Sequence, residues 1–110
     1  MKTWYQIKNY ASDPSTVAMD ITDEIGAWGV PAKQFLADLR ALPAGVRQIN
    51  LSIHSPGGDV FDGLAIYNAL RAHPARVEVR IDGLAASMAS VVAMAGDTVR
   101  MPANAYMMIH

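Results

Sequence analysis

The spacing of apolar residues limits the fold of this chain more than any other feature, because it changes period several times. Ile49, Leu51 and Ile53 alternate with polar residues, as on a half-buried strand. A helical pattern follows over 59–70, and alternation returns over 77–81. Strand and helix thus succeed one another, which predicts an α/β domain. At 110 residues the chain is long enough for one domain, which we expect to cover 1–110.

Further elements follow from the same patterns. A helix should begin near Pro31, where a proline costs no hydrogen bond, and strands are expected over 4–9, 17–21, 98–101 and 106–109. Asp82-Gly83 is expected to form the turn after the strand at 77–81. The segment 87–95 carries no charged residue, so it should be a buried helix that ends at Gly96.

Composition excludes several classes of function. The formal net charge is −1 and the chain has no run of Lys or Arg, so we expect neither a nucleic acid nor an anionic membrane as partner. No stretch is apolar enough for a membrane span or a signal core, which predicts a cytoplasmic protein. Apolar residues make up 52% and charged residues 17%, and we expect the apolar excess to be buried partly between subunits of a homo-oligomer.

The chain contains no cysteine, which excludes disulfides, thiolate catalysis and cysteine-ligated metals. A covalent nucleophile must therefore be an oxygen or a lysine. We expect no metal and no cofactor.

Two strand–helix junctions carry residues suited to catalysis. The start of a helix offers free amide hydrogens and the positive end of the helix dipole, which suit a developing oxyanion. At the first junction, Ser55-Pro56-Gly57-Gly58, glycines let the backbone approach a substrate carbonyl, so Gly57 is a candidate for substrate binding. By itself this motif favours an ordinary turn before a helix.

The second junction places Ser87 at the start of the apolar helix. There its hydroxyl would point outward while the Met88 amide supplies an oxyanion donor, as in a nucleophile elbow. A lone serine at this place is more often a helix N-cap, and the chain lacks the Gly-x-Ser-x-Gly pattern of α/β-hydrolases here. The residues alone leave both roles open.

Taken together, the motifs resemble the ClpP family of serine peptidases in order and spacing. They are Ser55-Pro56-Gly57-Gly58-Asp59, Gly83-Leu84-Ala85-Ala86-Ser87-Met88-Ala89 and Met107-Met108-Ile109-His110, and the similarity runs from about Ile21 to His110. The resemblance implies a ClpP/crotonase-type spiral of repeated strand–turn–helix units. It also implies Ser87 as nucleophile, His110 as general base, and the amides of Gly58 and Met88 as the oxyanion hole. A protein or peptide would be the substrate.

Departures from the family pattern concern residues beside these groups. His54 stands where the family usually has asparagine, and Ala89 where it usually has glycine. We expect His54 to be structural or solvated and His73, before Pro74, to lie in a surface turn. The acid of the triad lies downstream of the histidine in the family, so the third triad member stays unassigned. The chain is accordingly expected to be an incomplete domain, truncated after His110, with little activity of its own.

The beginning of the chain resembles one branch of the family. An ordered strand over 4–9 and the sequence 54–64 are similar to the ClpP-like head-maturation proteases of phages and prophages. That resemblance implies capsid or scaffolding proteins as substrates and no ATP-driven unfoldase as partner. Two alternatives stay open: a crotonase-like acyl-CoA enzyme, which would need neither Ser87 nor His110, and a catalytically inactive oligomerising fragment.

Overall fold

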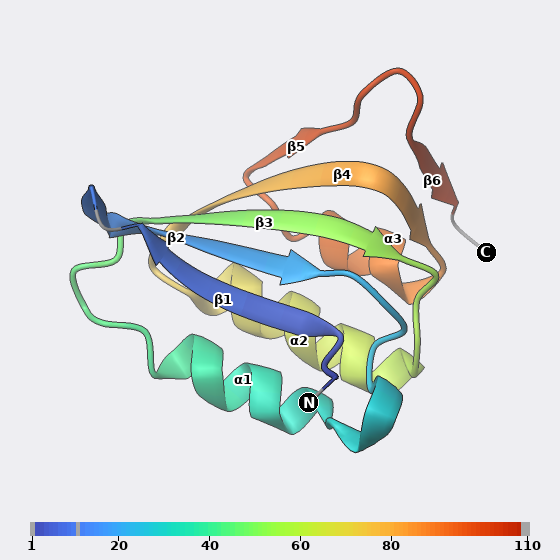
Figure 1. Cartoon of the computed structure of the whole chain (residues 1–110), viewed down its shortest axis with the longest axis horizontal. Coiled ribbons are helices and arrows are strands. Elements are labelled where there is room, and N and C mark those ends of the chain that lie inside the picture. The colour runs from blue at the N-terminus through green and yellow to red at the C-terminus, as the bar shows by residue number, and fades with distance from the viewer. Residues whose placement is uncertain (1, 11, 109–110) are drawn as a thin grey trace.

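Residues 2–10 and 12–108 are described by a computed structural model, in which the strands form one sheet and the helices lie against it (Figure 1). Strand β1 is Tyr5–Tyr10 and pairs antiparallel with β2, Asp13–Ile21. The elements that follow are the 3₁₀ helix η1 (Ala27–Gly29), α1 (Ala32–Arg40), β3 (Gln48–Ser55), α2 (Val60–Ala72), β4 (Arg76–Ala86), α3 (Met88–Ala93), β5 (Thr98–Arg100) and β6 (Tyr106–Met108). This order confirms the predicted alternation of strand and helix.

The parallel part of the sheet grows in the order of the sequence, from β2 to β3, β4 and β5. Crossover connections between parallel strands are right-handed, so strands added in one direction carry their helices on the same face. Figure 1 shows α1 and α2 along that face, and α3 packs against α2 in turn. The result is a one-sided spiral of strand–turn–helix units, which is the predicted fold class.

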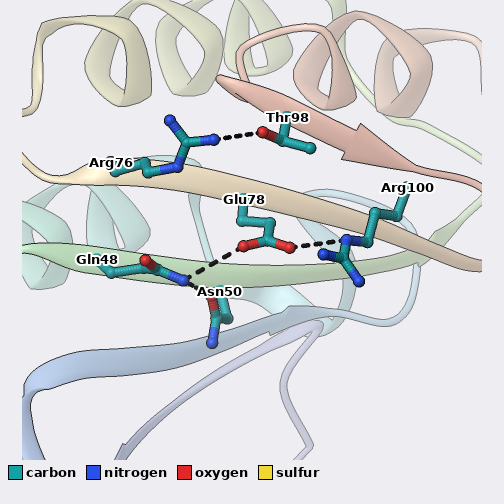
Figure 2. Close-up of polar contacts among 6 residues, drawn as sticks. All are labelled: Gln48, Asn50, Arg76, Glu78, Thr98 and Arg100. Carbon is teal, nitrogen blue, oxygen red and sulfur yellow. Dashed lines mark hydrogen bonds and ion pairs between the residues drawn. The ribbon is translucent and has the colours of Figure 1, made fainter.

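The two faces of the sheet differ in chemistry. The face towards the helices is apolar, and its core comes from alternate strand positions and one side of each helix: Ile49, Leu51, Ile53, Val77, Val79, Ile81, Phe35, Leu39, Ile66 and Leu70. The opposite face is polar (Figure 2), and there Glu78 accepts a hydrogen bond from Gln48 at 3.3 Å and pairs with Arg100 at 2.9 Å. Alternation along the strands thus separates a core face from a hydrated one.

Strand β4 continues past the point where the sequence pattern ended it. The predicted turn at Asp82-Gly83 is wrong, because both residues lie within β4. The register pairs Ile53 with Ile81 and then Ser55 with Ala85, so four steps along β4 match two along β3. Such an irregularity is a β-bulge, which bends a strand and re-aims the residues after it. β6 pairs with the last residues of β4, and this pairing keeps the strand extended beyond the bulge.

Helix α3 is shorter than the predicted helix over 87–95. After its last residue the backbone changes to 3₁₀-type turns, because the amides of Ala95 and Gly96 donate to the carbonyls three residues back, at 3.0 and 3.2 Å. The predicted burial is confirmed, since five of its six residues are buried: Met88, Ala89, Ser90, Val92 and Ala93. The helix packs against α2 and β4, which place its first turn beside the first turns of α2.

Candidate active site

Both junctions singled out in the sequence lie on one edge of the sheet. β3 and β4 are parallel, so their carboxyl ends point the same way. The Pro56-Gly57-Gly58 turn follows β3 and Ser87 follows β4, towards the end of the sheet where α3 begins (Figure 1). Ligands of open α/β sheets bind outside the carboxyl ends of the strands, so this edge is the place to look for a site.

The two turns are in direct contact at Gly57. This glycine has a φ of 110°, a backbone conformation that residues with a Cβ rarely adopt. A Cβ built on it would lie 2.9 Å from the Ala86 carbonyl oxygen, 3.0 Å from Ser87 Cβ and 3.2 Å from the Met88 nitrogen. Only glycine therefore fits here, and the lack of a side chain brings the first turn against the second.

Ser87 has an unusual backbone for a serine at a helix start. Its φ of 54° and ψ of −126° lie outside the regions that L-residues usually populate, and its side chain makes no capping hydrogen bond to α3. An N-cap serine normally has extended backbone and bonds the helix amides. A strained strand-to-helix turn that frees the hydroxyl is instead the geometry of a nucleophile elbow.

Hydrogen bonds from two sides hold this strained turn. The Ser87 amide donates to the Met108 carbonyl of β6 at 2.8 Å. The Ser87 carbonyl accepts from the Ser90 amide at 3.0 Å and from the Ser90 hydroxyl at 2.5 Å. Strained residues persist only when their surroundings over-determine them, and here both peptide groups of Ser87 are fixed.

Two backbone amides beside this turn are candidates for binding a ligand. Among the described residues, we find no hydrogen bond from the Gly58 or Met88 amide to a protein acceptor. The preceding carbonyls are fixed, because Gly57 O accepts from the Ile25 amide at 2.8 Å and Ser87 O accepts from Ser90. A peptide is planar with its C=O and N–H in opposite directions, so each fixed carbonyl also fixes the direction of the next amide. Fixed, unpaired amides are suited to an oxyanion.

The structure describes two of the three histidines, His54 and His73. His110, the predicted base, lies outside the described residues. His54 is exposed at the end of β3. His73 ends α2, where its Nδ1 accepts a hydrogen bond from the Ala75 amide at 3.0 Å and burial lowers its pKa. Its role there is structural, in agreement with the expected turn.

Carboxylates near the predicted turns have structural partners. Asp59 caps α2 by accepting a hydrogen bond from the Asp62 amide at 3.0 Å. Asp97 accepts from the Val77 amide at 2.8 Å, and Asp82 pairs with Arg80 at 3.1 Å. None of these contacts involves Ser87, so the third member of a triad stays unassigned.

Other classes of site leave little trace in residues 2–10 and 12–108. In this part of the chain, no three His, Cys, Asp or Glu side chains gather as metal ligands would. No helix there is long and apolar enough to cross a membrane. Ile25, whose amide donates to the Gly57 carbonyl, carries no local signal in the sequence, because its partner lies 32 positions away.

Comparison with known proteins gives a family match over nearly all of the chain. The family described as Clp protease matches residues 3–110. The chain belongs to this family. An ATP-dependent Clp protease proteolytic subunit of Deinococcus radiodurans is 44% identical to this Clp protease family member over 66 residues, which cover 58% of the chain and 32% of that protein.

Two further relatives extend the match along the chain. An uncharacterized protein of Methanocaldococcus jannaschii is 31% identical over 113 residues, covering 96% of this chain and 40% of that protein. The crystal structure of the ClpP protease catalytic domain from Plasmodium falciparum superposes with a TM-score of 0.68 at 28% identity, covering 87% of this chain and 55% of that one. The chain thus spans 40% of the length of the Methanocaldococcus protein and 32% of that of the Deinococcus protein, less than half of either.

Proposed function

We propose that this chain carries the nucleophile and oxyanion-hole part of a serine peptidase. Ser87 is the nucleophile, His110 the general base, and the amides of Gly58 and Met88 bind the oxyanion. Gly57 gives the substrate carbonyl close access to these amides. The observation that carries the proposal is the contact of Gly57 with Ser87 and Met88, at 3.0 and 3.2 Å from the position of a Cβ. It joins two motifs that stand 30 residues apart in the sequence.

The reaction follows from these roles. The Ser87 hydroxyl attacks the carbonyl carbon of the scissile peptide while the His110 imidazole takes its proton. The carbonyl oxygen becomes an oxyanion between the two amides, each of which is worth about 3–4 kcal/mol of barrier. Collapse expels the amine, which receives the proton from His110, and leaves an ester on Ser87. Water then hydrolyses the ester by the same steps.

The position of β6 supports His110 as the base. Met108, which accepts the hydrogen bond from the Ser87 amide, precedes His110 by two residues. An imidazole with a pKa of about 6.5 is a suitable base near neutral pH.

Covalent labelling tests the assignment. In the native protein, a fluorophosphonate should label Ser87, and Ser87→Ala should abolish the label without unfolding the protein. Ser52→Ala, a half-buried serine on β3, is the matched control and should label normally. Label on Ser55 or Ser90, or an undiminished label in Ser87→Ala, would remove Ser87 from the mechanism. A wild-type protein that takes no label while folded would favour the inactive oligomerising fragment.

We also propose phage capsid or scaffolding proteins as substrates, a homo-oligomeric state, and action without an ATP-driven unfoldase. Support comes from β1, an ordered strand over Tyr5–Tyr10 that pairs antiparallel with β2, which is the feature on which the resemblance to the phage proteases rests. The test is incubation with the capsid and scaffolding proteins of the same phage, without ATP. Discrete products are expected. Processive degradation that requires an ATPase would contradict this specificity.

A further inference from the structure

Ser55 is one of two buried polar residues in the described part of the chain, the other being Ser90. It is 1% exposed and is the last residue of β3, immediately before the Pro-Gly-Gly turn. A buried hydroxyl is costly unless it is hydrogen-bonded, so its partners indicate what it holds.

The Ser55 hydroxyl donates one hydrogen bond and accepts another, in both cases with backbone groups around the turn. It donates to the Asp23 carbonyl at 2.6 Å and accepts from the Gly57 amide at 3.1 Å. The same neighbouring segment supplies the Ile25 amide, which donates to the Gly57 carbonyl at 2.8 Å. Both peptide groups of Gly57 are therefore tied, one through the Ser55 hydroxyl and one directly, to the segment that follows β2.

These bonds fix the direction of the Gly58 amide. The Gly57 carbonyl and the Gly58 N–H belong to one planar peptide and point in opposite directions. Rotating the Gly58 amide would turn the Gly57 carbonyl away from the Ile25 amide, and the hydrogen bond to Ser55 opposes the change in Gly57 backbone angles that this rotation requires. Ser55 also pairs with Ala85 of β4 in the register, so the clamp lies beside the strand that leads to Ser87.

We infer that Ser55 is a positioning residue, which holds the Gly57–Gly58 peptide so that the Gly58 amide stays directed at the oxyanion. This inference rests on the proposed function, because the Gly58 amide has a catalytic role only in that reaction. Ser55 touches no reacting atom. It acts through Gly57.

The test compares Ser55→Ala with Ser52→Ala. Ser52 lies three residues earlier on β3, on the opposite face of the sheet, and takes part in none of these bonds. In the native protein, Ser55→Ala should lower kcat for a peptide ester by a factor on the order of 10–100 with KM within about twofold, because a misdirected donor acts on the transition state. The pH midpoint of kcat should not move, since the base is untouched. Ser52→Ala should match the wild type.

A purely structural role would give another result. It would lower the melting temperature of Ser55→Ala and leave kcat per folded molecule unchanged, and that outcome would overturn the inference. Equal loss in Ser52→Ala would do the same.

A second measurement does not depend on activity. Hydrogen exchange of the Gly57 amide, followed by NMR, should be at least about tenfold faster in Ser55→Ala than in the wild type. Unchanged exchange would show that no clamp exists. If the wild type exchanges slowly at Gly57 but neither labels nor cleaves, the proposed function fails while the clamp stands. If the wild type reacts and Ser55→Ala reacts equally well, the positioning role alone fails.

Discussion

Among the described residues, two non-glycine residues have a positive φ, Trp28 and Ser87. Trp28 lies in η1 and is half exposed. Ser87 is held at both of its peptide groups, by Met108 and Ser90. Backbone strain of this kind costs about 1–3 kcal/mol and is retained where its surroundings over-determine it. At the residue scale, backbone conformation and backbone hydrogen bonds therefore define the candidate site more than charged side chains do.

Gly57→Ala tests that geometry. An alanine at this left-handed position costs about 1–2 kcal/mol of backbone energy, and its Cβ would meet the Ala86 carbonyl at 2.9 Å. With an overpacking cost of about 1–3 kcal/mol, the free energy of unfolding should fall by roughly 2–5 kcal/mol. Urea denaturation measures this. Gly45→Ala is the control, because nothing lies within 4 Å of its Cβ position, and it should change stability by less than about 1 kcal/mol. Equal stability of the two variants would contradict the close contact.

At the scale of elements, the approach of α3 to α2 sets the place of Met88. Gly63 of α2 is buried, and a Cβ there would lie 2.7 Å from Met88 Cε and 2.9 Å from Met88 Cβ. The methyl end of methionine can move aside, whereas its Cβ moves only with the backbone of α3. The missing side chain at Gly63 thus lets the first turn of α3 sit where its amide reaches the edge of the sheet.

Gly63→Ala should therefore destabilise the protein despite the better helix propensity of alanine. Propensity favours the change by about 1 kcal/mol, and overpacking opposes it by about 1–3 kcal/mol. We expect a net loss of up to roughly 2 kcal/mol in the free energy of unfolding, with slower labelling of Ser87. Asn68→Ala, exposed on the same helix, should be neutral or slightly stabilising. A Gly63→Ala variant as stable as Asn68→Ala would show that α3 is free to shift.

The connection from α2 to β4 predicts a pH dependence. Burial lowers the pKa of His73 below its ordinary value of 6.5, so the unfolded chain binds this proton first as the pH falls. The contribution of neutral His73 is thus present above about pH 6.5 and lost as the pH falls through the folded pKa. In His73→Asn, thermal unfolding should lose less stability than in the wild type between about pH 7 and 5. Parallel pH profiles of the two proteins would exclude His73 as the cause.

At the scale of the whole molecule, the described residues form a domain of ordinary compactness with incompletely covered surfaces. The radius of gyration is 12.9 Å, close to the roughly 13 Å of a compact 100-residue domain. Parallel sheets normally have both faces covered, whereas here the helices cover one. Apolar side chains are also exposed on the first turns of α2, where Val60 is 54%, Phe61 80% and Leu64 40% exposed.

We expect this α2 surface to drive self-association. Three neighbouring exposed apolar side chains are typical of a protein–protein contact. Phe61→Ser should shift the protein towards the monomer in size-exclusion chromatography with light scattering, and change the free energy of unfolding by less than about 0.5 kcal/mol per monomer. Asn68→Ser, on the same helix, should leave the assembly unchanged. A wild type that is monomeric at high concentration would contradict the expectation.

Much of the fold is encoded over short stretches of sequence, and those parts were predicted. Alternation in β3 and the capping Asp59 of α2 depend on neighbours a few residues away, so a window of sequence carries them. The absence of charge over 87–95 likewise predicts the burial of α3 without any knowledge of its partners. The order of the motifs also identified Gly57, Gly58 and Ser87 as candidates before their positions in space were known.

What only the tertiary structure decided depends on partners distant in sequence. β4 runs through Asp82-Gly83 because β6 pairs with its last residues, a contact that outweighs the local preference of these residues for a turn. The positive φ of Ser87 and the clamp on Gly57 likewise need Met108 and the segment after β2. By itself the sequence determined most of the strands and helices and the candidate site residues, because local spacing and short motifs carry that information. The contact of the two turns required the folded sheet, because hydrogen bonds between distant segments impose it.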